Sequence, residues 1–543
     1  MTTAATLAPP ARPAERVRTS APWWMSLLAG IAAFTGTGSA TLNGDELATI
    51  SAASRSLSGM WELARHIDGH FLPYYLFMHF WVKAGTAELW LRLPSAVGIG
   101  VAAWFLVDLG RRLHSTRAGV VAATVFAILP SVSYFGAFAR SYAFAAAAVA
   151  FSFWALHRAV ERSEVRRWVV YGGAVALVCS THLFAVLVLP AQLLLVRRAR
   201  VVPMLAAMAV GCVPAAVLGL VGFGERHAIS WIPQRGPEVW LKFPKMAAGA
   251  TGLGVMLFAL ALAGAVLLWR AAPRGAGAVT LGSEAPHEAG AVTLGSETPR
   301  EAGAVPLRSG APRGIEESGG ARARESGRAG AGETGETRVW VFVLVGWLVL
   351  PPVLLLAVSQ LVTPVYVDRY LFVTAPALAL LAGLAVAALP RFQVVAAVVV
   401  VLLGCALSVQ EHVTVREENG RFENIPWALR VIKAEPDDAI VYGQSQLRTG
   451  FEYYADSLMP VDVLKSGEAP SPDGFGYPER SDATAALDGR DRVWVVWRGS
   501  KQSGLDGDAV PRVAEVVQAG FKLSLAKHSA ELPGLTVALF VRR

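Results

Sequence analysis

Runs of about 20 mostly apolar residues recur along this chain, and they restrict its fold more than any other feature. Trp90–Leu109, Val201–Val221 and Val339–Val358 are each long enough to cross a bilayer as a helix. Hydrophobic residues make up 54% of the 543 positions and charged residues 17%, against about 25% charged in soluble proteins. Because a spanning segment must satisfy its own backbone hydrogen bonds, the sequence predicts an α-helical polytopic membrane protein.

The positions of the Arg clusters predict the topology. Arg111 and Arg112, Arg166 and Arg167, and Arg197 and Arg198 follow or precede apolar runs and should lie in the cytoplasm. The run Trp168–Leu195 is broken by Ser180-Thr181-His182, and two short spans there keep its flanking clusters on one side. We therefore expect about 11 spans, with the N-terminus inside and the C-terminus outside.

Composition divides the rest of the chain. Three cysteines in separate apolar runs resemble core residues and form no disulfide or metal framework. The net charge of +8 fits Lys and Arg on cytoplasmic loops among membrane lipids, and it does not indicate nucleic acid as a partner. The expected parts are a cytoplasmic tail (1–22), a membrane catalytic module (23–269) with its first outer loop (43–89), a disordered low-complexity cytoplasmic loop with 13-residue repeats (270–338), further spans (339–410) and a small α/β extracytoplasmic domain (411–543).

Asp45 and Glu46 follow the end of the first apolar run. An acidic pair at this place is also common at helix starts, so the local sequence alone favours a solvated helix-start motif. The topology, however, collects an unusual set of polar residues on the same outer side. These residues are Asp45, Glu46, His66, Asp68, His70, Arg92, Arg140, Tyr142, His182, Asp368, Arg369 and Tyr370.

Several members of this set have a second interpretation. Arg92 fits a snorkelling or capping residue, His182 a polar plug between short helices, and Tyr370 an interface anchor. Arg369 fits either a phosphate ligand or an ion-pair partner of Asp368, and a divalent-metal site at His66, Asp68 and His70 stays open without a strong spacing motif. Taken together, a carboxylate beside several Arg suits a substrate that is part lipid and part phosphate, since Arg binds phosphate with two hydrogen bonds and a carboxylate can act as a general base.

An ordered series of short motifs carries a family resemblance. It comprises Gly44-Asp45-Glu46, Asp68-Gly-His70 with Pro73-Tyr74-Tyr75, Arg92-Leu-Pro94-Ser95, Ala139-Arg140-Ser-Tyr142, Thr181-His182 and Asp368-Arg369-Tyr370. The chain resembles the GT-C superfamily of membrane glycosyltransferases, in the polyprenyl-phosphate-mannose-dependent, protein mannosyltransferase-like branch. It departs from the family at Ala137-Phe138, where a Gln-Glu pair is frequent. That departure removes an acidic group from the turn before Arg140.

The resemblance implies an inverting transferase without nucleotide cofactors. It would move a sugar, mannose by family default, from a polyprenyl-phosphate donor to a hydroxyl of a glycan, lipid or protein acceptor outside the plasma membrane. Asp45 and Glu46 would be catalytic, with Asp45 as base and Glu46 orienting the site, and Arg140, Arg369 and Tyr370 would bind the donor phosphate. The remaining expected substrate-binding residues are His66, Asp68, His70, Tyr74, Arg92, Tyr142 and His182.

Two further functions stay open at this point. One is a lipid-linked glycan ligase or arabinosyltransferase of the same architecture. The other is a transporter or flippase, which the one-sided polar set, the outer domain and the lack of an evident repeat of the spans disfavour.

Overall fold

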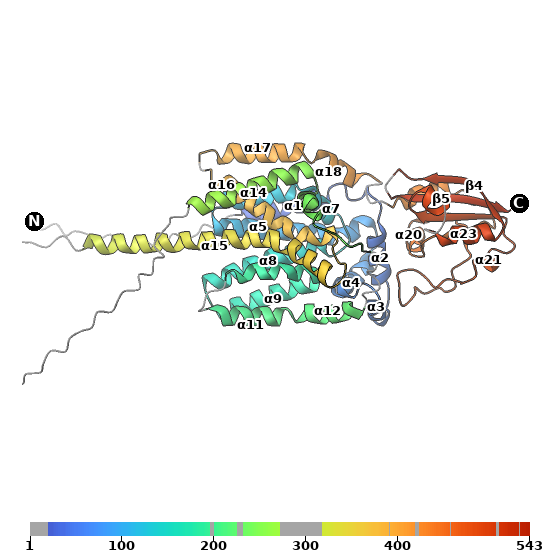
Figure 1. Cartoon of the computed structure of the whole chain (residues 1–543), viewed down its shortest axis with the longest axis horizontal. Helices are drawn as coiled ribbons and strands as arrows, with labels where there is room; N and C mark the ends of the chain where they lie inside the picture. Colours follow the sequence, from blue (N-terminus) through green and yellow to red (C-terminus); the bar gives the residue numbers. More distant parts are fainter. Residues whose placement is uncertain are drawn as a thin grey trace, which may run out of the picture.

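The computed structural model describes residues 20–195, 200–224, 232–271, 318–389, 391–418, 423–456, 458–505, 510–530 and 533–542. Long helices lie side by side in a bundle, and a smaller domain built around a β-sheet stands at one end of it (Figure 1). Short helices lie between the two. Residues 1–19 of the predicted cytoplasmic tail and residues 272–317 of the predicted repeat loop fall outside the described residues. The long helix α15 begins at Ser318, inside the segment expected to be a loop.

Six helical segments in the described part of the chain are long and apolar enough to cross a membrane. Two bent helix pairs raise that number to eight if each pair is one span. Shorter helices occupy the other three places where a span was predicted, so the total of about 11 spans stays a prediction. The long segments are α5 (Glu88–Leu113), α8 (Tyr142–Glu161), α11 with α12 (Val201–Gly211 and Val213–Gly224), α14 (Thr251–Ala271), α15 (Ser318–Leu361) and η6 with α16 (Asp368–Thr374 and Ala375–Ala387). The bent pairs are α6 with α7 (Thr116–Ala127 and Pro130–Gly136) and α17 with α18 (Gln393–Ala406 and Val409–Arg416). The shorter helices are α1 (Ala21–Phe34), α9 (Val165–Thr181) and η3 with α10 (Leu183–Val188 and Leu189–Leu193).

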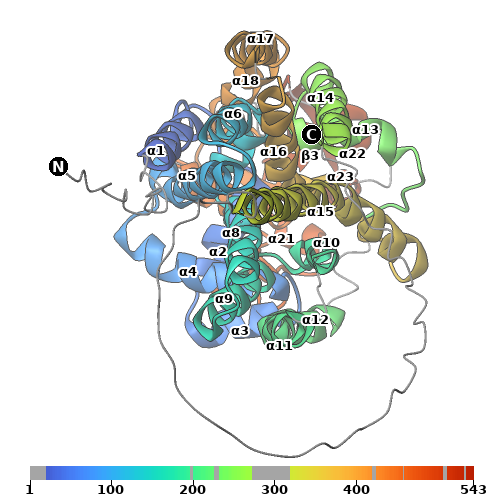
Figure 2. The ribbon, with the colours of Figure 1, turned by 90° about the vertical axis from the view of Figure 1, so that its left-hand side faces the viewer.

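Small residues let the central helices approach closely. A Cβ atom on Gly119 of α6 would lie 2.2 Å from the Val107 carbonyl oxygen of α5, and one on Gly383 of α16 would lie 2.5 Å from the Ala118 carbonyl oxygen. Such contacts replace the hydrophobic driving force that helices lack inside a bilayer. The most apolar part of η6 and α16 is completely buried, whereas α11 and α12 lie at the edge of the bundle (Figure 2).

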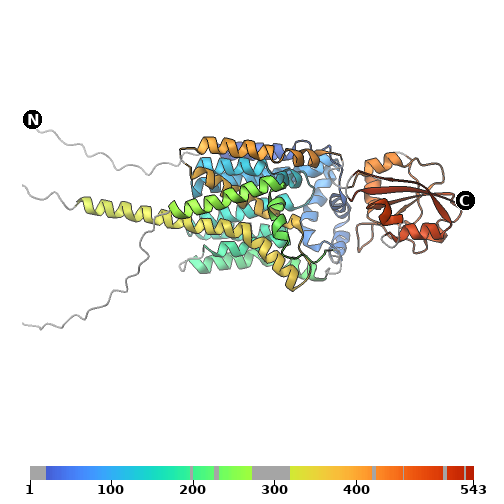
Figure 3. The ribbon, with the colours of Figure 1, turned by 45° about the horizontal axis from the view of Figure 1, so that its top comes forward.

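The end of the bundle that faces the sheet domain is covered by short helices (Figure 3). They arise where the long apolar runs stop and Ser, Asn, Gly and Pro provide helix starts. This layer receives the loops that join the long helices. Its members are α2 (Gly44–Ala53), α3 (Leu57–Ala64), η1 (Gly69–Phe71), α4 (Leu72–Trp81), η2 (Val82–Ala84) and α13 (Val239–Ala248).

The C-terminal residues form a mixed five-stranded sheet in the order β2-β1-β3-β5-β4. The central strand, β3 (Arg492–Arg498), is apolar on both faces. Trp494 and Val496 belong to the core that includes the bundle, while Val495 and Trp497 pack into a second core on the opposite face. β1 pairs in parallel with β2 and β3, and β5 pairs antiparallel with β3 and β4. The elements are α19 (Ile425–Val431), β1 (Ala439–Tyr442), α20 (Leu447–Tyr454), β2 (Val461–Asp462), α21 (Ala483–Ala486), β3 (Arg492–Arg498), α22 (Lys501–Leu505), α23 (Pro511–Gln518), β4 (Phe521–His528) and β5 (Leu535–Arg542).

Candidate active site

Helix α2 begins with a capping box that sets the direction of its two acidic residues. The Asn43 side chain accepts a hydrogen bond from the Glu46 backbone N–H at 3.1 Å, and the Glu46 carboxylate accepts from the Asn43 backbone N–H at 3.3 Å. This reciprocal pairing stabilises the first helical turn. It also turns Glu46 into the protein and leaves Asp45, one residue earlier, on a different side of the helix.

Glu46 forms a completely buried ion pair with Arg92 of α5. Arg92 donates to the two carboxylate oxygens at 2.8 and 2.9 Å, and the Ala139 backbone N–H donates to the same carboxylate at 3.0 Å. The remaining Arg92 donors bind the backbone carbonyls of Thr37, Ala40 and Thr41. This Glu46–Arg92 clamp ties together α2, α5 and the loop that carries Arg140. The structure thus buries Glu46, expected to orient the site, against Arg92, expected to bind substrate, and their pair supports the Arg140 loop.

Asp45 lies at the surface of the layer of short helices, between two guanidinium groups. Its carboxylate oxygens lie 3.7 Å from Nη2 of Arg140 and 3.8 Å from Nη2 of Arg369. The side chain is 30% exposed, so small molecules can reach it. The three residues come from α2, the loop between α7 and α8, and the start of η6. The topology-based prediction that these distant residues meet agrees with this geometry.

Arg140 is held by a second set of contacts. Nη2 lies 3.0 Å from the Asp68 carboxylate, the Tyr75 hydroxyl accepts a hydrogen bond from Nη1, and the guanidinium lies over the Phe71 ring at 4.3 Å. Arg140 is 3% exposed, and its buried Nε has no hydrogen-bond partner among the described residues. Buried donors are normally satisfied, so this nitrogen can donate to a bound ligand.

Asp68 is strained into the left-handed backbone region, with φ of 57°. This conformation turns the chain so that its carboxylate faces Arg140 and accepts a hydrogen bond from the Tyr75 hydroxyl at 2.7 Å. Burial alone would raise the Asp68 pKa, but Arg140, His70 and these hydrogen bonds outweigh it, so the pKa lies below the ordinary value. Asp68 is therefore an anion that holds the Arg140 guanidinium.

Imidazole and aromatic rings form the wall next to the two arginines. His182 is 1% exposed, and in the part of the chain that the structure describes neither of its ring nitrogens has a hydrogen-bond partner. Its ring lies 4.7 Å from that of Tyr370 and 5.5 Å from that of Tyr142. His70 lies on the other side at 6.1 Å, and burial lowers its pKa to about 4, with Asp68 opposing and both arginines adding to the shift. His70 is thus uncharged at neutral pH.

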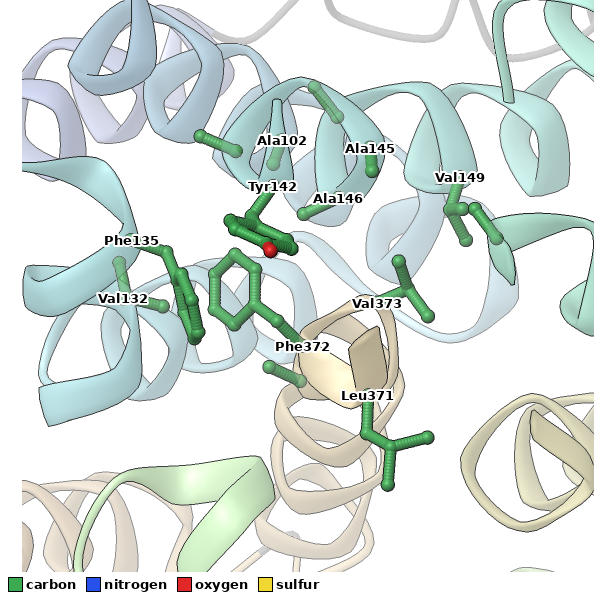
Figure 4. Close-up of a cluster of buried hydrophobic side chains, with 14 of the residues drawn as sticks. Ala102, Val132, Phe135, Tyr142, Ala145, Ala146, Val149, Leu371, Phe372 and Val373 are labelled. Carbon is green, nitrogen blue, oxygen red and sulfur yellow. The ribbon is translucent and has the colours of Figure 1, made fainter. Parts of the chain in front are cut away.

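A buried hydrophobic cluster fixes the two helix starts beneath this wall (Figure 4). Phe135 of α7 packs against Tyr142 at 5.1 Å and against Phe372 of η6 at 4.5 Å between ring centroids. Tyr142 follows Arg140 by two residues and Phe372 follows Arg369 by three. Packing of the aromatic rings therefore sets the separation of the two guanidinium groups.

Two expected substrate ligands lie elsewhere. His66 is exposed in the turn that follows α3 and contacts Glu62 at 3.2 Å, away from the two arginines. Tyr74 is buried against Phe77 and Phe144, so it supports the aromatic layer. No group of three or more His, Cys, Asp or Glu within the described ranges is arranged to hold a metal ion.

Two contributors to the site were missed from the sequence. Tyr75 contacts both Asp68 and Arg140. Asp68 lies before α4 in a left-handed turn, so helical periodicity does not link it to Tyr75, and only the motif Pro73-Tyr74-Tyr75 pointed to this tyrosine. Glu423 is the second contributor, since burial raises its pKa and the charge of the Asp45 carboxylate raises it further. It lies more than 370 residues further along the chain, in a segment without any local motif.

Comparisons with known proteins agree with the resemblance drawn from the motifs. Residues 71–222 match the family model described as dolichyl-phosphate-mannose-protein mannosyltransferase. No curated protein matches the sequence. Crystal structures of ArnT from Cupriavidus metallidurans align over 96% of this chain and 98% of theirs at 14% identity, with TM-scores of 0.55 in the apo state and 0.54 bound to undecaprenyl phosphate.

Arabinofuranosyltransferase AftD from Mycobacteria aligns over 96% of this chain and 40% of its own, with 13% identity and a TM-score of 0.48. The two ArnT structures show a shared fold over nearly the whole chain. The family-model match over residues 71–222 agrees with the mannosyltransferase-like resemblance drawn from the motifs. The chain is a multi-pass membrane protein with the ArnT fold.

Proposed function

We propose that this chain, a membrane protein of the GT-C fold, is an inverting glycosyltransferase that uses a polyprenyl-phosphate sugar. The observation that carries the proposal is the Asp45 carboxylate within 3.8 Å of two arginines from separate loops. This arrangement combines a proton acceptor with groups that bind a phosphate. The ArnT structure bound to undecaprenyl phosphate supports a donor of the same chemical class. We place the site at the outer face of the plasma membrane because the Arg clusters mark the opposite end as cytoplasmic.

Asp45 is the proposed general base. It takes the proton of an acceptor hydroxyl while the acceptor oxygen attacks C1 of the sugar from the face opposite the phosphate. The C1–oxygen bond to the lipid phosphate breaks, and its electron pair leaves with the phosphate, so the sugar configuration inverts. The proton then passes from Asp45 to water. A 30% exposed side chain is suited to this exchange with solvent.

Arg140 and Arg369 would stabilise the charge that collects on the departing phosphate, with the Tyr370 hydroxyl beside them. Asp68 and Tyr75 orient Arg140 for this task, since both contact its guanidinium. Glu46 and Arg92 act indirectly, because their buried ion pair positions α2 and the Arg140 loop. These roles divide the polar set into groups that touch the donor and groups that position them.

The neutral imidazoles suit the sugar better than the phosphate. An uncharged ring nitrogen exchanges hydrogen bonds with hydroxyl groups, and the two unpartnered nitrogens of His182 are buried next to Tyr142 and Tyr370. Aromatic faces beside them provide apolar surface for the sugar ring. We therefore assign His70, His182 and Tyr142 to the sugar part of the donor.

The description of the family model favours mannose as the sugar. A lipid-linked glycan ligase or arabinosyltransferase would use the same base and phosphate ligands, so the donor assay decides between these substrates. A transporter or flippase has no need of a base between two phosphate ligands at one end of the bundle.

The test is transfer of label from polyprenyl-phosphate mannose in membranes that contain the chain. Asp45→Asn should lower transfer by at least about a hundredfold, in the range lost when a general base is removed. Glu62→Gln, which removes an exposed carboxylate of the same outer loop, is the matched control and should retain activity. Full transfer by folded Asp45→Asn would exclude Asp45 as the base, and a polyprenyl-phosphate pentose donor used in parallel identifies the sugar.

A further inference from the structure

The C-terminal domain contacts the short segment that leads into α2. The Thr41 hydroxyl donates toward the backbone carbonyls of Glu423 at 3.1 Å and Glu418 at 3.2 Å. The Leu42 backbone N–H donates to the Tyr454 hydroxyl of α20 at 2.7 Å. The segment immediately before Asp45 is therefore held by residues that follow the last membrane helix.

An ion pair of the C-terminal domain also packs directly against Gly44. Glu423 pairs with Arg498, the last residue of β3. A Cβ atom on Gly44 would lie 3.0 Å from Arg498 Nη2 and 3.1 and 3.2 Å from the two Glu423 carboxylate oxygens. The pair thus occupies the space that a side chain at position 44 would need, and it lies against the residue next to Asp45.

Charge links this pair to Asp45. Glu423 is 7% exposed, and its carboxylate lies against the Gly44 backbone. Burial raises the Glu423 pKa, Arg498 opposes this, and the Asp45 carboxylate raises it further. The carboxylates of Asp45 and Glu423 and the guanidinium of Arg498 therefore lie together at the first turn of α2.

We propose that Glu423 and Arg498 are positioning residues for the base, fixing the first turn of α2 so that Asp45 reaches the acceptor hydroxyl. The C-terminal domain thereby completes the active site. This inference rests on the proposed role of Asp45, but it concerns a different part of the chain. The pair lies against Gly44, whereas the donor-binding arginines come from the loop before α8 and from η6, so its loss should affect turnover and leave donor binding unchanged.

The experiment measures kcat and the donor KM of the full chain in detergent or membranes. Glu423→Gln and Arg498→Gln should each lower kcat about tenfold at unchanged donor KM, since a small misplacement of a reacting group is costly. The double variant should lose little more than either single one, because both remove the same interaction. Arg498→Lys, which keeps the charge, should recover part of kcat. Glu435→Gln breaks an ion pair with Arg492 at the other end of β3 and is the matched control, expected at wild-type kcat.

A second readout does not depend on activity. Deuterium uptake by the 41–47 backbone should rise in Glu423→Gln and stay at the wild-type level in Glu435→Gln. Unchanged kcat and unchanged uptake in folded Glu423→Gln would overturn the inference and leave the proposed function intact. A wild-type chain without transfer activity would instead overturn the proposed function, and the uptake experiment would still decide whether the pair holds α2.

Discussion

Removing the charge of Glu46 tests whether the Glu46–Arg92 clamp is structural. Both side chains are completely buried, and Arg92 donates to each carboxylate oxygen. In Glu46→Gln the new amide group places N–H donors against the guanidinium donors, and the Arg92 charge loses its partner. The substitution keeps the size of the side chain, so the effect reports charge and hydrogen bonding.

The structure sets the magnitude. A buried pair that loses one member costs about 3–5 kcal/mol, because the other charge stays buried without compensation. Replacing both members, as in Glu46→Leu with Arg92→Met, removes the stranded charge but leaves the carbonyls of Thr37, Ala40 and Thr41 without donors. We therefore expect the double variant to be more stable than the sum of its single variants predicts, by about 1 kcal/mol or more.

Equilibrium unfolding in mixed micelles with increasing SDS, followed by tryptophan fluorescence, measures the free energy of unfolding. Glu62→Gln is the control, since its exposed pairing with Arg65 contributes at most about 1 kcal/mol. A loss below about 1 kcal/mol in Glu46→Gln would show that the clamp is no stronger than a surface pair. Additive losses in the double variant would contradict direct coupling between the two side chains.

Two further predictions concern the donor site. Arg140→Met should weaken binding of polyprenyl phosphate by about tenfold or more, measured with the lipid lacking its sugar, whereas His182→Phe should weaken only the sugar-bearing donor; equal losses of both ligands in His182→Phe would contradict the sugar assignment. Because the folded-state pKa of His70, about 4, lies below its ordinary value of 6.5, the unfolded chain binds the proton first and stability should fall as pH drops through this window, by on the order of 3 kcal/mol for this group. His70→Gln should flatten that part of the profile of unfolding free energy against pH, and an unchanged slope would refute the assignment.

Local properties of the sequence were enough to predict the membrane helices. Apolar length, Arg clusters and turn residues act over short stretches, so they place helices without knowledge of their neighbours. The same local logic found the acidic start of α2 and the arginines at positions 140 and 369. Their meeting followed from topology, since loops on one side of a membrane share a small area.

The family resemblance assigned Asp45 as the base and Glu46 as the support, but the local sequence offers no physical reason for that division. Asp45 and Glu46 differ by one methylene group and one position. The difference arises because α2 turns Glu46 toward Arg92, while Asp45 faces Arg140 and Arg369. Only packing of α2 against α5 sets these partners, so a motif of adjacent acids does not reveal them.

The sequence by itself thus determined that the chain crosses a membrane, which residues lie at one end of its helices, and which family it resembles. Tertiary structure alone decided that Arg92 supports, that His66 lies apart, and that Tyr75 contacts Arg140. It also brought Glu423 and Arg498 onto Gly44 from the far end of the chain. The length of an apolar run depends only on residues that are neighbours in sequence. The partner of a buried charge depends on the whole fold, because a buried ion must be compensated by a group that can come from any part of the chain.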